Sequence, residues 1–166
     1  MRLKYYFLLP FILLYSCNNN SFSNEMKNDY YNAIELRKDK NLMVSINLFE
    51  KIFTNFPQSK YAPMSLYQIG DIYLNDIKNY DLALSYFKKL NRIFPNSESG
   101  KIALFLCGYI SNNYLQEFSS AFDYYNSFKD LYPNDSLIFS VDYELYDPNT
   151  GLINFIQVID SLNNQL

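Results

Sequence analysis

The residue types needed for catalysis or metal binding are scarce in this chain. It contains no histidine, which removes the most frequent general base and metal ligand. Carboxylates such as Asp71 and Asp76, or Asp123 and Asp130, are not three or four residues apart, the spacing at which side chains are direct neighbours on a helix. The sequence has no glycine-rich phosphate loop and no metal-ligand spacing. We therefore predict that the protein is not an enzyme and requires no cofactor, metal or small-molecule substrate.

Two cysteines are the remaining residues with distinctive chemistry. Cys107 lies in an apolar run, which predicts a buried structural thiol with no histidine to activate it. Cys17 follows a different pattern, because Arg2 and Lys4 precede an apolar run over residues 5–15. That run is too short to cross a bilayer, which takes about 20 residues, but it is typical of a signal peptide.

The end of this apolar run, Leu14-Tyr15-Ser16-Cys17, resembles the lipobox of bacterial lipoproteins. In that family the cysteine receives lipid chains such as palmitate and becomes the mature N-terminus. The resemblance implies a lipoprotein signal peptide over residues 1–16 and lipidation of Cys17, and Asn18 favours delivery to the outer membrane. We expect the anchored protein to face the periplasm. Together the acyl chains would anchor the protein stably. The alternative is an ordinary secretory signal with an incidental cysteine.

The residues after Cys17 carry no packing signal. Residues 17–25 are polar and lack helical periodicity, so we predict a lipidated cysteine followed by a flexible tether. The whole chain has a net charge of −3 and no basic cluster, which argues against nucleic acid as a partner.

The rest of the chain is organised by a repeat. Pro57, Pro95 and Pro133 are spaced by 38 residues, and Gly70 and Gly108 keep the same period. Three more columns share this register: Ser45, Ala83 and Ala121; Phe49, Phe87 and Tyr125; Phe56, Phe94 and Tyr132. A fixed period of a few tens of residues predicts stacked helical hairpins, and therefore an all-α solenoid.

The repeat boundaries follow from the prolines, because proline disfavours helical geometry in the residue before it. We expect repeats over residues 26–134, divided as 26–58, 59–96 and 97–134. Amphipathic spacing predicts their helix pairs at 26–38 with 42–55, 60–75 with 80–93, and 97–113 with 118–131. Residues 135–166 are predicted as a C-terminal capping pair, with helices at 136–146 and 152–162.

Two local features refine this prediction. Ser59 and Ser97 follow their prolines and are expected to cap the next helix. Gly70 and Gly108 lie inside helical patterns, where glycine costs about 1 kcal/mol relative to alanine. We expect them to allow close approach of the second helix where Ala83 and Ala121 face it.

These columns resemble the tetratricopeptide repeat, which has a helix-A glycine, an aromatic residue three positions on (here Tyr73), an alanine opening helix B and a terminal proline. The period in that family is about 34 residues. We expect the extra length here after each proline and in a longer turn between the helices. This longer form resembles envelope lipoproteins of the BamD type and the YbgF (CpoB) type, over residues 26–162.

The resemblance implies a groove lined by helix A that holds a partner protein or peptide. The matching positions are Lys27, Tyr30, Arg37, Lys38, Met64, Tyr67, Asp71, Asn75, Ile102, Phe105, Tyr109, Asn112 and Asn113. The alternative is that Tyr67, Ile102 and Phe105 belong to the core. These positions contain no cationic cluster that could clamp a terminal carboxylate.

We therefore expect a protein-interaction scaffold in the bacterial envelope, a BamD-like outer-membrane lipoprotein that supports assembly of outer-membrane proteins. Its expected partners are envelope proteins or peptides, and its lipid provides the membrane contact. Two alternatives remain: a YbgF-type coordinator of the Tol-Pal system and cell division, and an accessory subunit that binds glycan or peptidoglycan.

Overall fold

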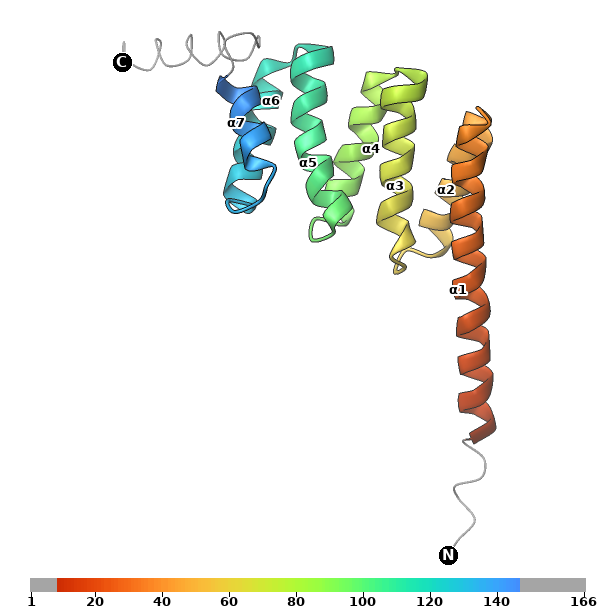
Figure 1. Ribbon diagram of the computed structural model, residues 1–166. Helices are drawn as coiled ribbons and strands as arrows, with labels where there is room; N and C mark the ends of the chain where they lie inside the picture. Colours follow the sequence, from red (N-terminus) through yellow and green to blue (C-terminus); the bar gives the residue numbers. More distant parts are fainter. Residues whose placement is uncertain (1–8, 147–166) are drawn as a thin grey trace, which may run out of the picture. The chain divides into compact units, whose positions relative to one another are not determined.

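The computed structural model describes the backbone of residues 9–146 and the side chains of residues 24–146, and this part of the chain is helical without any strand. The helices are α1 (Leu9–Lys38), α2 (Leu42–Asn55), α3 (Tyr61–Asp71), η1 (Ile72–Ile77), α4 (Tyr80–Ile93), α5 (Glu98–Ile110), η2 (Ser111–Leu115), α6 (Phe118–Leu131) and α7 (Ile138–Tyr146) (Figure 1). The all-α fold class is confirmed. The predicted second helix of each repeat coincides with α2, α4 and α6, residue for residue.

The chain divides into two compact units, with the boundary between Ser65 and Leu66 inside α3. Unit 1 contains α1, α2 and the start of α3, and unit 2 contains the later helices. Among the described residues, no helix is both long enough and apolar enough to span a membrane. The second capping helix predicted at 152–162 lies outside the described residues.

The core of unit 1 lies between α1 and α2. Ala33 of α1 and Phe49 of α2 are completely buried, because the apolar residues of each helix recur every three or four positions and form one face. Between the helices, Ser45 Oγ donates a 2.7 Å hydrogen bond to the Ala33 carbonyl oxygen. Tyr30 closes this core, with its ring centroid 5.5 Å from Phe49 and 5.2 Å from Tyr61.

The first helix is longer than the sequence pattern predicted. α1 begins at Leu9 and therefore includes residues 18–25, where we expected a flexible tether. The physical reason is that no glycine or proline interrupts residues 11–38. Asn and Ser cost only about 0.5–0.7 kcal/mol each in a helix, so periodicity alone does not decide whether such a segment is helical. Pro10 is compatible with the first turn, where its missing amide has no helical partner.

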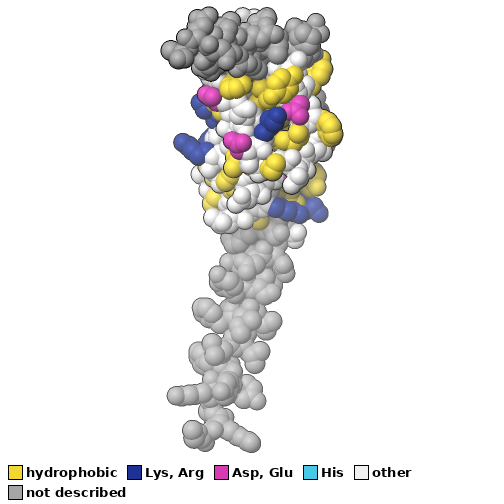
Figure 2. Space-filling view, turned by 90° about the vertical axis from the view of Figure 1, so that its left-hand side faces the viewer, with side chains coloured by type: hydrophobic (Ala, Val, Ile, Leu, Met, Phe, Trp, Pro, Cys, Tyr) yellow, Lys and Arg dark blue, Asp and Glu magenta, His cyan; other side chains and the backbone are white. Residues whose placement is uncertain are grey.

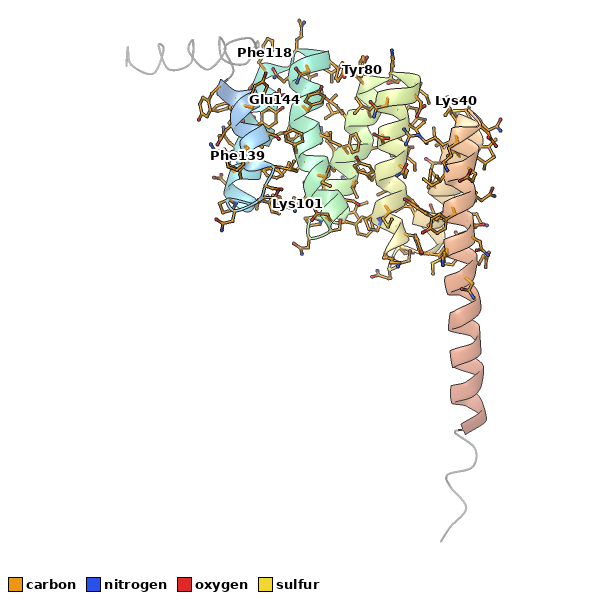
Figure 3. All side chains as sticks on the ribbon, viewed as in Figure 1. Lys40, Tyr80, Lys101, Phe118, Phe139 and Glu144 are labelled. Atoms are coloured by element: carbon orange, nitrogen blue, oxygen red, sulfur yellow. The ribbon has the colours of Figure 1, made fainter. Side chains whose placement is uncertain are left out.

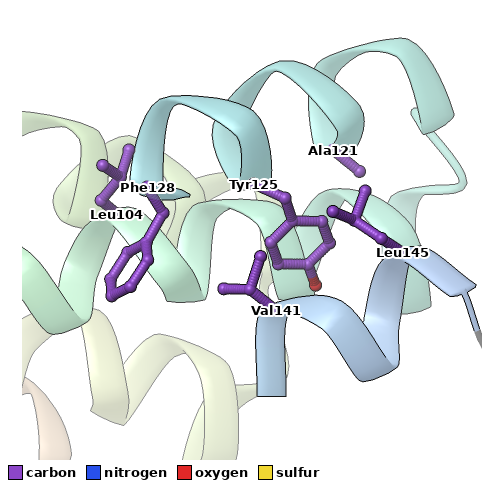
Figure 4. Packing of buried hydrophobic residues seen from close by; sticks show 6 residues of the cluster. All are labelled: Leu104, Ala121, Tyr125, Phe128, Val141 and Leu145. Carbon is purple, nitrogen blue, oxygen red and sulfur yellow. The ribbon is translucent and has the colours of Figure 1, made fainter. Parts of the chain in front are cut away.

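In the described part of unit 2, two similar hairpins are followed by α7. In the first hairpin α4 follows α3 and η1, and in the second α6 follows α5 and η2. α7 packs against α6 through Val141 and Leu145, and Tyr125 of α6 projects between these two side chains (Figure 4). All three residues are almost completely buried. The repeated columns thus become the core: Ser45, Ala83, Ala121, Phe49, Phe87 and Tyr125 are all fully buried.

The two helix-A glycines contact an aromatic ring rather than the expected alanine. A Cβ atom added at Gly70 would lie 2.8 Å from Phe87 Cε1, and one added at Gly108 would lie 2.6 Å from Tyr125 Cε1. The three atoms nearest to each added Cβ atom belong to the ring of Phe87 or Tyr125, and Ala83 and Ala121 are not among them. The ring is one helical turn beyond the alanine, and it occupies the space that a side chain on helix A would need.

We expected a longer turn between the paired helices. In the structure, the C-terminal end of the first helix of each unit 2 hairpin is widened instead. η1 and η2 are π-helical turns, which accommodate one extra residue inside helix A. Each ends at a residue in left-handed conformation, Lys78 with φ 60° and Gln116 with φ 56°, and Lys40 occupies the same place in unit 1 with φ 63°. These residues are again 38 positions apart, so they belong to the repeat.

One of the two predicted serine caps is present. Ser97 Oγ accepts a 2.9 Å hydrogen bond from the Gly100 amide, which satisfies a free donor at the start of α5. Ser59 does not cap α3 with its side chain, because the Ala62 amide donates to the Ser59 carbonyl oxygen instead. Its hydroxyl has no hydrogen-bond partner among the described residues.

Candidate functional site

The candidate site is a hollow of about 450 Å³ between α5 and α7 of unit 2, open to solvent. Its size is within the range of about 300–1,000 Å³ that is typical of ligand sites. Seven side chains line it, four of them aromatic: Phe105, Leu106, Tyr109, Phe139, Ser140, Tyr143 and Glu144. The hollow lies on the helix-A side of the repeats, where the sequence predicted the groove.

The aromatic walls come from two helices. On α5, Phe105 and Tyr109 are one turn apart, and their rings are nearly parallel with centroids 6.4 Å apart. On α7, Phe139 and Tyr143 are also one turn apart and are exposed by 84% and 63%. Figure 3 marks Phe139 and Glu144 on α7. Large aromatic side chains with such exposure leave most of their surface available to a partner.

A carboxylate lies at the side of this hollow. Glu144 is only 8% exposed, and its Oε2 accepts hydrogen bonds from Asn112 Nδ2 at 2.8 Å and Asn113 Nδ2 at 2.9 Å. These bonds connect α7 to η2 and fix the orientation of the carboxylate. Burial and the Glu144 charge both raise the pKa of the Tyr125 hydroxyl above its ordinary value. Burial, Tyr114 and Glu144 likewise raise the pKa of Tyr109.

The structure brings four of the predicted groove residues to this site. Phe105 and Tyr109 line the hollow, and Asn112 and Asn113 hold its carboxylate. Asp71 and Asn75 form their own pair on the preceding helix, with Asn75 Nδ2 2.6 Å from Asp71 Oδ1. The other predicted positions that keep exposed or half-buried side chains are Lys27, Arg37, Lys38, Met64, Tyr67 and Ile102.

Two predicted groove residues are buried. Tyr30 is 6% exposed because its ring fills the space between α1 and α2, so it is a core residue. Asn112 is 4% exposed, and the widened turn of η2 directs its amide toward Glu144. Asn112 therefore acts on the hollow through Glu144 rather than by contact with a partner.

Sequence reasoning missed the α7 side of the hollow because residues 135–166 were interpreted only as a cap. The signal was present in the pattern of α7. Val141 and Leu145 form one apolar pair at i and i+4, while Phe139 and Tyr143 form a second pair on another face. A capping helix needs only the first pair, so the second pair indicates a surface for contact.

A second hollow, of about 550 Å³, has the opposite character. It lies mainly along α4, and its lining includes Lys88, Lys89 and Arg92 with a single carboxylate from Asp81. Leu104 and Cys107 line it as well. The two hollows of unit 2 thus differ in charge, one basic and one acidic and aromatic.

The structure supports a structural role for Cys107. The thiol is 1% exposed, and burial raises its pKa to about 12, so it carries no thiolate at neutral pH. Cys17 lies in the part of α1 whose side chains are not described. Within the described residues, no group of three His, Cys, Asp or Glu side chains is placed to hold a metal ion.

Comparisons with known proteins give the repeat class. Residues 64–97 match the family model described as tetratricopeptide repeat. Two crystal structures of kinesin light chain TPR-like repeats from Podosopora anserina are similar, with TM-scores of 0.51 and 0.50 and 10% sequence identity. Each match covers 73% of this chain, which spans 63% and 64% of the length of those chains. No curated protein matches the sequence.

The family match covers α4 and most of α3 with η1, the same stretch in which the glycine, alanine and proline columns occur. The solved structures support the solenoid fold of helical hairpins. Tetratricopeptide repeats imply a scaffold that binds other proteins, and they are typically not enzymes.

Proposed function

We propose that this tetratricopeptide-repeat chain is a protein-interaction scaffold, and that the hollow between α5 and α7 binds an extended segment of its partner. One observation carries the proposal: Phe139 and Tyr143 are the exposed wall of a hollow whose opposite wall is also aromatic. Asn113 and the Glu144 carboxylate add hydrogen-bonding groups beside these rings. Such a mixture suits a peptide, which offers both backbone polar groups and apolar side chains.

We further propose that the scaffold belongs to the bacterial envelope and is anchored to the outer membrane through lipid on Cys17. The support is the Leu14-Tyr15-Ser16-Cys17 sequence after an apolar run, together with the repeats. In this proposal the protein supports assembly of outer-membrane proteins, as BamD-type lipoproteins do. A Tol-Pal or cell-division role of the YbgF type is the second candidate within the same class.

Affinity purification of the full-length protein from membranes, after mild crosslinking, tests the scaffold proposal. We expect stable recovery of specific envelope proteins and loss of that recovery when Phe139 and Tyr143 are both replaced by serine. Leu131→Ser is the matched control, because Leu131 is 63% exposed on α6 but does not line the hollow. Recovery of no specific protein, or equal losses with the control, would contradict the proposal.

The identity of the recovered proteins separates the two envelope roles, since barrel-assembly components and Tol-Pal components are distinct sets. Binding of muropeptides to the purified chain, without any protein partner, would instead favour a glycan-binding accessory subunit. The anchor has its own test. Cys17→Ala should release the protein from the membrane fraction without changing its circular dichroism spectrum.

A further inference from the structure

We propose that the hollow between α5 and α7 selects a partner segment that carries a lysine or arginine side chain, whose cationic end binds between the aromatic rings beside Glu144. This inference rests on the proposed function and names the chemistry of the partner at the same site. Three observations support it: the rings, the carboxylate and the surrounding charges.

The aromatic rings supply the first part of the recognition. An aromatic ring attracts a cation to its face, and the contact is effective within about 6 Å of the ring centroid. Phe105 and Tyr109 on α5 are 6.4 Å apart and nearly parallel, and Phe139 and Tyr143 lie across the hollow on α7. A lysine or arginine stem would cover these apolar surfaces while its head meets the ring faces.

Glu144 supplies the second part. A carboxylate that is 8% exposed and still lines the hollow brings a negative charge close to any occupant. Asn112 and Asn113 hold Glu144 Oε2 in place, so a cation meets a preorganised group. An acidic side chain at the same position would be repelled.

The surrounding charges supply the third part. No lysine or arginine lines this hollow. Lys101 is the one basic residue of α5, and α7 has none. Lys101 lies 2.8 Å from Glu98 and 2.5 Å from Asp135, and Lys129 on the adjoining α6 lies 2.6 Å from Asp142. Figure 2 faces the α6 and α7 end and shows hydrophobic side chains gathered on this surface, with side chains of both charges among them.

The test uses short peptides that are identical except for a central Lys, Arg, norleucine or Glu, with fluorescence anisotropy of each peptide against the full-length protein in a neutral detergent. We expect the Lys and Arg peptides to bind about tenfold more tightly than the norleucine peptide, and the Glu peptide to bind least. Raising the salt concentration should weaken the binding of the Lys and Arg peptides more than the binding of the norleucine peptide.

Three variants locate the contact. Glu144→Gln keeps the shape of the side chain and should remove most of the preference for Lys and Arg. Phe139→Ala should weaken binding several-fold without a folding defect, because Phe139 is 84% exposed. Asp142→Asn is the matched control: it removes the same charge from the same helix, but Asp142 pairs with Lys129 and does not line the hollow, so binding should not change.

The outcomes separate this inference from the proposed function. A preference for neutral or acidic peptides would overturn it, and dependence of acidic peptides on Lys88 would place recognition in the basic hollow instead. Equal binding by Glu144→Gln, Phe139→Ala and Asp142→Asn would also overturn it. If no peptide binds but membrane purification still recovers a partner through Phe139 and Tyr143, the scaffold proposal stands and the charge selection is wrong.

Discussion

Gly108 lies directly against the ring of Tyr125, so closely that an added Cβ atom would be 2.6 Å from Tyr125 Cε1. The corresponding distance from Gly70 to Phe87 Cε1 is 2.8 Å. Both rings are fully buried and cannot move aside without disturbing the hairpin core. The spacing of helix A and helix B is therefore set by a glycine and a ring in each of these two repeats.

The first prediction concerns this contact. Gly108→Ala would gain about 1 kcal/mol from helix propensity but lose about 1–3 kcal/mol from overpacking. We expect a net loss of up to about 2 kcal/mol in the free energy of unfolding, measured by urea denaturation with circular dichroism. The loss should shrink when Tyr125 is already leucine. A Gly108→Ala variant at least as stable as the original protein would contradict this prediction, because it would show that the Tyr125 ring can shift without cost.

The second prediction concerns the left-handed residues after η1 and η2. Lys78 and Gln116 have φ of 60° and 56°, which costs a residue with a Cβ atom about 1–2 kcal/mol. Glycine avoids this cost but loses about 0.5–1 kcal/mol of backbone entropy. We expect Lys78→Gly and Gln116→Gly each to raise the free energy of unfolding by up to about 1.5 kcal/mol, measured as a higher urea midpoint. Lys88→Gly in α4 is the control and should destabilise by a similar amount.

The third prediction is a pH dependence at the Lys101–Asp135 pair, whose Nζ and Oδ2 atoms are 2.5 Å apart. The hydrogen bond from Lys101 is the main cause that lowers the pKa of Asp135, and the bond to Asp135 is the main cause that raises the pKa of Lys101. Because the pKa of Asp135 is lower in the folded chain, its ionised form stabilises the fold at pH values above the ordinary carboxyl pKa of about 4. This stabilisation is lost as the pH falls through the lowered pKa. Because the pKa of Lys101 is raised in the folded chain, its charged form stabilises the fold at pH values below the ordinary lysine pKa of about 10.4. This stabilisation is lost as the pH rises through the raised pKa.

Thermal unfolding between acid and neutral pH checks this prediction. Asp135→Asn should lower the melting temperature at neutral pH and flatten the acid part of the profile, because asparagine cannot ionise. Asparagine can still accept the hydrogen bond that Asp135 Oδ1 accepts from the Leu137 amide, so that local cap is preserved. A parallel acid profile in the variant and the original protein would contradict the assignment to Asp135.

The fourth prediction concerns the thiol of Cys107. Burial raises its pKa to about 12, so almost no thiolate exists at neutral pH, and the thiolate is the reactive form. In a Cys17→Ala background, Cys107 is the only thiol of the chain. A thiol reagent should then react fully in urea but only at the rate of unfolding under native conditions. Rapid labelling of the folded protein would mean that the thiol is accessible.

The helices could be predicted from the sequence where an apolar helical face is followed by a residue that ends the helix. α2, α4 and α6 carry apolar residues at helical spacing and end before a proline, and all three were predicted to the residue. α1 was not, because its beginning depends on the absence of helix breakers rather than on a packing face. The cap at Ser59 was also not predictable. A serine two residues after a proline does not show whether the Ala62 amide will donate to its hydroxyl or to its carbonyl oxygen.

Only the α5 side of the candidate site could be predicted from the sequence, because only that side follows the repeat pattern. Phe105 and Tyr109 lie at positions where the tetratricopeptide pattern places groove residues, so α5 could be mapped. Phe139 and Tyr143 lie where the repeat pattern decays, and Glu144 is 31 and 32 residues from the asparagines that bind it. A hydrogen bond between such distant residues depends on the packing of α7 on α6, which no local pattern specifies.

The widened ends of helix A have one further consequence. A single additional residue in a helix turns everything beyond it by about 100°. The side chains of η1 and η2 therefore point in directions that an uninterrupted α-helix would assign to their neighbours in the sequence. Anyone transplanting Asn112 and Asn113 onto a designed array with the usual shorter repeat would have to shift them by one position to recreate the bonds to Glu144.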